Sequence, residues 1–237
     1  MSDPSATTPT TAAPATPPTQ VDLVASWLRD DILTGRRTPG ENLREVELAR
    51  RHEVSRHTLR AALRQLASEG LVRIDANRGA RVIQLDGDEL RALFELRTAL
   101  EVEAARLLHE RRGFDPWPVE VEQASLALQR ACTRAVPDAV VIDQAHAELH
   151  HAIVAAAESP RITAVHESLT AVNRAVLLQS RIALPPPQMA ALHRDLLVDL
   201  RAIGPDALRS HLAAGAFAAA TPAPVTPPDH QTAPDPR

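Results

Sequence analysis

Proline and glycine divide this chain into segments whose apolar residues recur at helical spacing, and this pattern constrains the fold more than any other feature. Aromatic residues form only 2% of the sequence, so the core must be built from Ala, Leu, Val and Ile, which favours closely packed helices. After residue 86 the pattern predicts six helices, at 87–112, 117–134, 138–158, 161–183, 186–203 and 205–220. We therefore predict an all-α antiparallel helical bundle over residues 86–220.

The region before residue 86 has a different order of elements. Three helices and then a β-hairpin are predicted, at 21–35, 43–52, 56–69, and at 71–74 with 81–83. Ser55 stands where it can cap the third helix. Helix, helix, turn, helix and hairpin is the order of a winged helix-turn-helix. The predicted fold is therefore mainly α, with a winged helix-turn-helix at 20–85 in front of the bundle.

The two ends of the chain have a different composition from the rest. Residues 1–19 and 221–237 consist largely of Pro, Thr and Ala, and such segments cannot bury enough apolar surface to offset the entropy of ordering. We expect both to be disordered tails. The sequence shows no secretory signal and no apolar run of membrane-spanning length, and its single cysteine is Cys132. These features predict a cytoplasmic protein that does not contact a membrane.

Positive charge is concentrated in the predicted winged module. Residues 21–84 contain 12 Arg and 9 acidic residues, a net charge of +3, whereas the rest of the chain carries −7. A recognition helix contacts base edges with its N-terminal residues, and Arg binds both guanine and phosphate. We therefore expect this module to bind double-stranded DNA; the alternative is a solvated arginine face on an ordinary three-helix domain. The expected contacts are Ser55, Arg56, His57, Thr58, Arg60 and Arg64 on the third helix and Arg78, Gly79 and Arg81 on the wing.

The same region resembles a known family. The run PGENLREVELARRHEVSRHTLRAALRQLASEGLVRI, followed by NRGARV, covers residues 39–82 and resembles the GntR family of bacterial repressors. The resemblance implies that Arg56 and Arg60 contact bases or phosphates and that the wing near Gly79 enters the minor groove. Two positions depart from the family pattern. Val46 stands where many members carry a DNA-contacting Arg, so either Arg44 takes that role or one contact is absent. Glu53 stands where the turn often has Gly.

The second region resembles the effector domain of one branch of that family. Residues 87–112 are similar to the opening of the FCD domain, the ligand-sensing bundle of FadR-like regulators, in which the Arg97 and Glu101 positions recur. We accordingly expect a homodimer that pairs mainly through its bundles. Pairing would place two recognition helices on the two half-sites of a pseudo-palindromic operator.

Four histidines in the bundle predict a metal site. His146 and His150 are four residues apart on one helix, so their imidazoles share a face and can reach one ion. His193 and His211 lie on the last two predicted helices, which an antiparallel bundle can bring to the same interior pocket. Four neutral imidazoles favour Zn²⁺, or Ni²⁺, over Mg²⁺ and Mn²⁺. The alternative is a set of ordinary surface or core histidines.

The FCD resemblance supports this ligand set. FCD domains that bind metal carry an Asp four residues before a His and two further His on the last two helices, and His146 stands here at the Asp position. Asp143, one turn earlier, is predicted to fix the tautomer of His146 by a hydrogen bond. The histidines predicted not to bind metal are His52, His57, His109, His151 and His166.

A metal ion with open coordination positions in an apolar bundle can anchor a carboxylate, so a small carboxylic acid is the expected effector. Asn173 and Arg174, on the helix expected to face His146 and His150, are candidates to hold the rest of the acid. Arg97 is a further candidate, although a buried ion pair with Glu101 is at least as consistent with its position.

These features together predict a ligand-responsive, DNA-binding repressor and not an enzyme. One alternative is a metal-dependent hydrolytic enzyme, but the chain has no H-E-x-x-H motif, no phosphate-binding glycine loop and no nucleophile elbow. The other alternative is a non-specific DNA-binding structural protein, in which basic charge would be spread along the whole chain.

Overall fold

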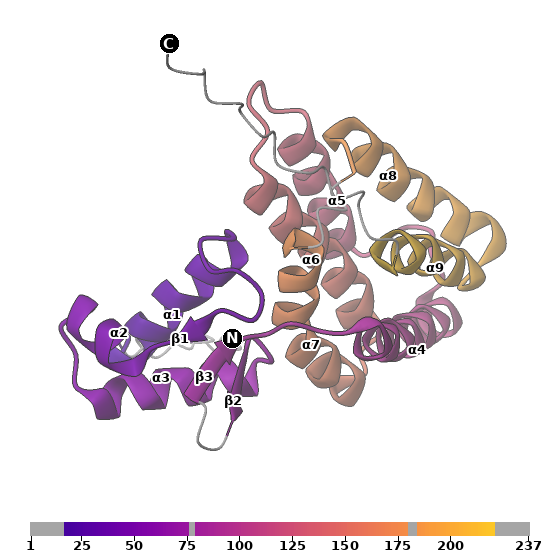
Figure 1. The fold of residues 1–237 in the computed structure, drawn as a ribbon. Helices are drawn as coiled ribbons and strands as arrows, with labels where there is room; N and C mark the ends of the chain where they lie inside the picture. Colours follow the sequence, from indigo (N-terminus) through magenta and orange to yellow (C-terminus); the bar gives the residue numbers. More distant parts are fainter. Residues whose placement is uncertain (1–16, 76–78, 180–183, 221–237) are drawn as a thin grey trace, which may run out of the picture.

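The computed structural model describes residues 17–75, 79–179 and 184–220, which form two helical units joined at α4 (Figure 1). The residues predicted as disordered tails lie outside the described part, except for 17–19, where Thr19 caps the first helix. In chain order the elements are α1 Gln20–Leu33, β1 Asn42–Leu43, α2 Glu45–Arg51, α3 Arg56–Ser68, β2 Val72–Asp75, β3 Gly79–Val82, α4 Gly87–Arg112, α5 Val119–Cys132, α6 Ala139–Ala156, α7 Pro160–Gln179, α8 Pro186–Ile203 and α9 Asp206–Ala220.

The first unit is a winged helix-turn-helix, which confirms the prediction. Helices α1 and α3 pack against each other, with Leu28, Leu59 and Leu66 fully buried between the elements. Ser55 caps α3, because its hydroxyl accepts a hydrogen bond from the backbone N–H of Thr58 at 3.0 Å. The wing has a third strand, β1, which pairs antiparallel with β3 in the sheet order β1-β3-β2. The sequence did not predict β1 because two residues are too few to show strand alternation.

The turn between α2 and α3 keeps a glycine-like backbone without a glycine. Glu53 has a φ of 53°, in the left-handed region that favours glycine. The turn nevertheless closes, because the N–H of Val54 donates to the carbonyl of Ala49 at 3.0 Å. The departure from the family pattern at this position therefore leaves a strained residue but an intact helix-turn-helix.

The second unit is the predicted all-α bundle. Helix α4 packs against α6, α7 and α9, while α5 packs against α6 and α8. The large side chains that lie fully buried in this core include Leu108, Leu128, Leu149, Ile153 and Leu200. Within the described ranges, no helix has the length and the apolar character needed to cross a membrane.

Helix α7 belongs to the bundle but also packs against the winged helix-turn-helix, between the two units (Figure 1). Val172 and Ala175 are buried in the same apolar cluster as the side chains of α1 and α3. Gly70 follows α3 with a φ of +75°, and a Cβ built there would lie 3.3 Å from the Cβ of Val172. The core of the first unit is therefore completed by a helix of the second.

Candidate metal centre and DNA-binding surface

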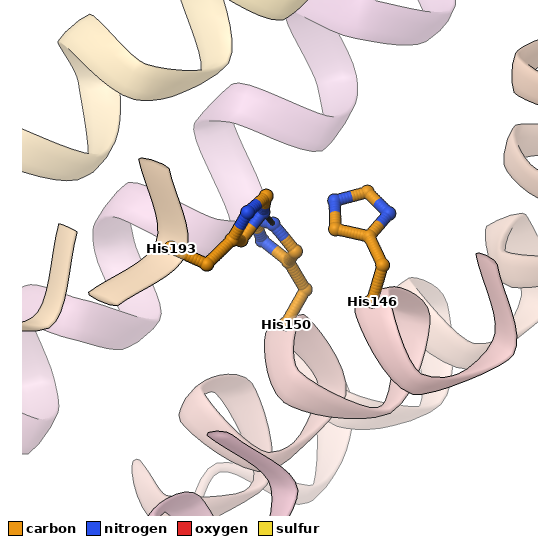
Figure 2. Close-up of side chains that lie close together, drawn as sticks. All are labelled: His146, His150 and His193. Carbon is orange, nitrogen blue, oxygen red and sulfur yellow. Dashed lines mark hydrogen bonds between the residues drawn. The ribbon is translucent and has the colours of Figure 1, made fainter. Parts of the chain in front are cut away.

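Three histidines converge inside the bundle, two from α6 and one from α8 (Figure 2). His146 and His150 project from one face of α6, and His193 reaches them from α8. All three are buried, and one ligand nitrogen from each lies within 4.8 Å of the others. In the described part of the chain no other such group of His, Cys, Asp or Glu side chains is found.

Two of these imidazoles are oriented so that their Nε2 atoms face each other. The Nδ1–H of His150 donates to the carboxylate of Glu101 at 2.6 Å, and the Nδ1–H of His193 donates to the backbone carbonyl of Met189 at 2.9 Å. A neutral imidazole carries one proton, so both Nε2 atoms are left as bare acceptors. They lie 3.4 Å apart. Two lone pairs that face each other at this distance repel unless a cation lies between them.

The spacing of the two nitrogens fits a tetrahedral metal ion. A Zn–N bond of roughly 2.0–2.1 Å and tetrahedral angles place two ligand nitrogens about 3.3–3.4 Å apart. The observed separation of 3.4 Å between His150 and His193 has this value. The spacing of this one pair therefore fits two ligand positions of zinc, and imidazoles also suit Ni²⁺.

Burial keeps these histidines neutral, as metal ligands must be. It lowers the pKa of His146 well below the ordinary value, and His150 and His193 next to it lower it further. Burial, followed by His150, lowers the pKa of His193 to about 3. The pKa of His150 is also lowered by burial, although Glu101 opposes the shift. Neutral imidazoles at physiological pH need lose no proton before they bind an ion.

His211, predicted as the fourth ligand, flanks the three. Helix α9 brings its ring to 4.6 Å from the ring of His193 and to 5.4 Å from that of His150, measured between centroids. Burial lowers its pKa to about 2, so it too is neutral. However, the group of nitrogens within 4.8 Å of one another contains only the other three. A role for His211 as a ligand stays a prediction.

The other five histidines of the described residues are not part of this group of three. His52 stacks on Trp27 and His109 packs on Phe114. His57 is exposed on α3, and His151 is partly exposed with its ring stacked on that of His166. His166 is different, because it is buried next to the cluster and contacts Glu101.

Glu101 links the cluster to the rest of the core, which sequence reasoning did not predict. Its side chain is 1% exposed. One carboxylate oxygen accepts from His150, while the other accepts from Arg97 at 2.5 Å and from His166 at 3.2 Å. Burial alone would raise the pKa of this carboxyl, but Arg97 and His150 hold it well below its ordinary value. The predicted Arg97–Glu101 ion pair is present, and it also orients a ligand histidine.

The prediction that Asp143 fixes the tautomer of His146 is wrong. Asp143 accepts a hydrogen bond from Nε of Arg174 at 2.6 Å, and no bond between it and His146 is present. The reason is tertiary: α7 brings a guanidinium to this carboxylate, and a permanent cation attracts it more strongly than a neutral imidazole does. Burial raises the pKa of Asp143, while Arg174 opposes that shift.

A cavity lies next to the histidines, between α4, α6 and α7. All three residues predicted to bind the effector line it, and Arg97 and Arg174 use only Nε in their ion pairs with Glu101 and Asp143. Asn173 is 8% exposed, and its Oδ1 has no hydrogen-bond partner. The complete lining is Arg97, His146, Ala147, His150, His166, Thr170, Asn173, Arg174 and Leu177.

The predicted DNA contacts that the structure describes lie on α3 and its N-cap, on β3, and at Arg44, the N-cap residue of α2. On α3, Arg56, His57, Arg60 and Arg64 are exposed, and Ser55 and Thr58 form its N-terminal cap. On β3, Gly79 is exposed and Arg81 is partly buried, with its Nε left without a partner. Arg78 lies outside the described residues.

Two of these arginines are held by acidic neighbours on α2. Nε of Arg60 donates to Glu45 at 2.7 Å, which leaves the terminal nitrogens of the guanidinium for another partner. Arg44, the N-cap residue of α2, is paired with Glu47 at 3.0 Å. Val46, where an arginine was expected by resemblance, is 58% exposed next to them.

Comparisons with known proteins agree with this architecture. The model of the family described as bacterial regulatory proteins, gntR family, matches residues 20–82, and the model of the FCD domain matches residues 92–215. A crystal structure of a GntR transcriptional regulator from Rhodococcus sp. RHA1 superposes with a TM-score of 0.70 at 24% identity, covering 84% of this chain and 97% of that one. That likeness shows the fold.

Two sequence relatives extend the comparison. The HTH-type transcriptional regulator BphR of Paraburkholderia xenovorans (strain LB400) is 35% identical over 143 residues, and the match spans 59% of this chain and 58% of that protein. A protein of Paenarthrobacter nicotinovorans, named "Probable D-xylose utilization operon transcriptional repressor", is 30% identical over 199 residues, 81% of this chain and 86% of that protein. The chain therefore belongs to the gntR family of bacterial regulatory proteins, as a member with an FCD domain, and this is a family of transcriptional regulators and not of enzymes.

Proposed function

We propose that this chain is a cytoplasmic, homodimeric repressor that binds a pseudo-palindromic operator and senses a small organic acid through a divalent metal ion in its FCD domain. The observation that carries the proposal is the double role of α7, which lines the effector cavity with one face and completes the core of the DNA-binding unit with the other.

The residues on the two faces of α7 are neighbours in sequence, so a movement of the helix at the cavity also moves the face that packs on the DNA-binding unit. Asn173 and Arg174 line the cavity, whereas Val172 and Ala175 are buried against the winged helix-turn-helix. Well-packed cores do not deform continuously, so a shift of this helix requires repacking at Gly70, directly after α3. An acid that binds better to the shifted arrangement would therefore change the affinity of α3 for DNA.

The metal ion would be held by four histidines, His146, His150, His193 and His211. Zinc fits the spacing of the His150 and His193 nitrogens best. Once bound, the ion would supply a positive charge that attracts a carboxylate. Glu101 holds the His150 ring in the ligating orientation, and Met189 does the same for His193. Arg97 and Arg174 keep their terminal nitrogens for the acid.

Two observations support a particular effect of the acid on DNA binding. One is the name of a relative, and the other is the ion pair between Asp143 and Arg174 at the cavity. The Paenarthrobacter relative is named as a repressor, so we propose that the acid releases DNA. Asp143 holds Arg174 only through Nε, so an acid bound to the terminal nitrogens attracts the same guanidinium and opposes its pairing with Asp143. When the acid draws Arg174 away from α6, α7 changes its position against the DNA-binding unit.

The proposal is tested on the purified full-length protein. Its operator is first selected from random DNA, and its metal content is measured by mass spectrometry. We expect one zinc or nickel ion per chain, and a nuclease footprint on one short pseudo-palindrome that weakens when acid is added. A footprint that extends along any DNA regardless of sequence would instead support the structural-protein alternative. Turnover of hydrolysable substrates is not expected.

A further inference from the structure

The cavity beside the histidines contains hydrogen-bond acceptors that no group satisfies. Nδ1 of His166 and Oδ1 of Asn173 are both buried and have no partner within the described residues. The two side chains are 4% and 8% exposed, and both line the cavity from the same face of α7. Buried polar atoms are almost always hydrogen-bonded, so two unpaired ones in a single cavity indicate a missing partner.

The tautomer of His166 follows from its neighbour. Its Nε2 lies 3.2 Å from Oε1 of Glu101, and this carboxylate is paired with Arg97 and also accepts a hydrogen bond from His150. An ionised carboxylate can only accept, so Nε2 of His166 carries the proton. Nδ1 of His166 is therefore an acceptor that faces the cavity with a bare lone pair.

The cavity thus presents two kinds of groups. Two of the lining groups are cations, the guanidinium groups of Arg97 and Arg174, which suit a carboxylate. Two others are the acceptors of His166 and Asn173, which a carboxylate cannot satisfy because it has no hydrogen to donate. A ligand that satisfies both needs a carboxylate and at least one donor close to it.

We propose that the effector is a hydroxy acid, whose hydroxyl donates to Nδ1 of His166 or Oδ1 of Asn173 while its carboxylate is held by the arginines and the metal ion. This inference rests on the proposed function and specifies the chemical class of its ligand. In the protein without effector, water can occupy these acceptors. A plain acid displaces that water without replacing its hydrogen bonds, and so loses affinity.

The experiment compares acids that differ by one hydroxyl. Zinc-loaded full-length protein is titrated calorimetrically with three pairs: lactate and propionate, malate and succinate, 2-hydroxyglutarate and glutarate. We expect at least one hydroxy acid to bind about tenfold or more tightly than its partner, because sites built to bond a hydroxyl reject the analogue that lacks it.

Two variants separate recognition by these side chains from chelation of the hydroxyl by the metal. Asn173→Leu removes the amide whose Oδ1 has no partner, and His166→Phe removes the imidazole. Circular dichroism checks that both variants fold. The control is His109→Phe, at an exposed histidine of α4 that packs on Phe114 and does not line the cavity. We expect the preference for the hydroxy acid to fall about threefold or more in at least one of the two cavity variants and to persist in the control.

Three results would overturn the inference in distinguishable ways. Equal affinity within every pair would reject the hydroxy acid and leave the acid sensor standing. A preference that survives in both cavity variants would assign the hydroxyl to the metal and not to His166 or Asn173. If none of the six acids bound the zinc-loaded protein, the proposed function itself would fail together with this inference.

Discussion

Val172 on α7 packs directly over Gly70, so closely that a Cβ at position 70 would lie 3.3 Å from its own Cβ. Gly70 follows the recognition helix, whereas the residue after Val172, Asn173, lines the effector cavity. The contact between Gly70 and Val172 therefore connects the end of α3 to the helix that lines the cavity.

Shortening Val172 should weaken this connection. We expect Val172→Ala to lower the free energy of unfolding by about 1–3 kcal/mol, because it leaves a cavity in a packed core. The effect of acid on operator affinity should shrink while the affinity for acid itself is kept, as measured by fluorescence anisotropy and calorimetry. Val165→Ala, at a 43% exposed position on the same helix, is the control. A full acid response in Val172→Ala would show that the signal takes another route.

Removing the charge of Glu101 should weaken metal binding without touching a ligand. In Glu101→Gln the His150 ring loses the carboxylate that fixes its tautomer. Loss of such an outer partner typically lowers metal affinity about 10–100-fold. Competition with a chromophoric chelator measures this, with circular dichroism to check the fold. The matched variant is Glu103→Gln, which changes an exposed carboxylate on the same helix that pairs with Arg106. Equal losses in both variants would contradict an orienting role.

The buried histidines should make the metal-free protein sensitive to mild acid. Burial lowers the pKa of His193 from 6.5 to about 3, so below pH 6.5 the unfolded chain takes up a proton that the folded chain refuses. Stability is therefore complete above pH 6.5 and falls as the pH drops towards 3. His193 alone should cost about 2 kcal/mol between pH 6.5 and 5.

Thermal unfolding of chelator-treated protein between pH 7 and 5 measures this loss of stability. Most carboxylates titrate below pH 5, so they contribute little over this range. His193→Asn should flatten the dependence, because its side chain does not titrate. A melting temperature that is the same at pH 7 and pH 5 would show that these histidines are not buried as neutral groups.

Glycine should stabilise the turn at position 53. Glu53 has a φ of 53°, and a side chain in this region costs about 1 kcal/mol relative to glycine. Glu53→Gly should therefore raise the melting temperature, while Glu53→Ala, which removes the carboxylate but keeps the Cβ, should not. If alanine stabilised as much as glycine, the carboxylate and not the backbone would be the source of strain.

Arg60 should contribute directly to DNA binding. Arg60→Ala should weaken operator binding by about 1–3 kcal/mol if its terminal nitrogens bond a base. Anisotropy titrations on operator DNA at fixed salt measure this change. Arg91→Ala, at an exposed arginine of α4 that pairs with Asp88, is the control. Unaltered operator affinity in Arg60→Ala would exclude this side chain from the interface.

Local sequence signals were enough to predict the fold. The Ser55 cap, the glycines after helices and the proline breaks act within a few residues, so they predicted α3 to α9 with ends close to those observed. The triad was also accessible, because His146 and His150 are one helical turn apart and His193 lies on a helix that an antiparallel bundle brings near. Only the two-residue strand β1 left no pattern.

Contacts between distant helices could not be predicted in this way. Glu101 and His150 are 49 residues apart, and their hydrogen bond depends on how α4 packs against α6. Asp143 was assigned to His146 on the same helix because the sequence does not show that α7 supplies Arg174. His166 was set aside as a non-ligand, although its spacing from Thr170, Asn173 and Leu177 places all four on one helical face towards the cavity.

The most direct test is a linkage cycle on the purified full-length protein. Operator affinity is measured with and without the tightest-binding acid, in zinc-loaded and in chelator-treated protein, and acid affinity is measured with and without operator. We predict that acid weakens operator binding only when zinc is present, and that operator weakens acid binding by the same factor, as linkage requires. Operator affinity that responds to neither zinc nor acid would contradict the account.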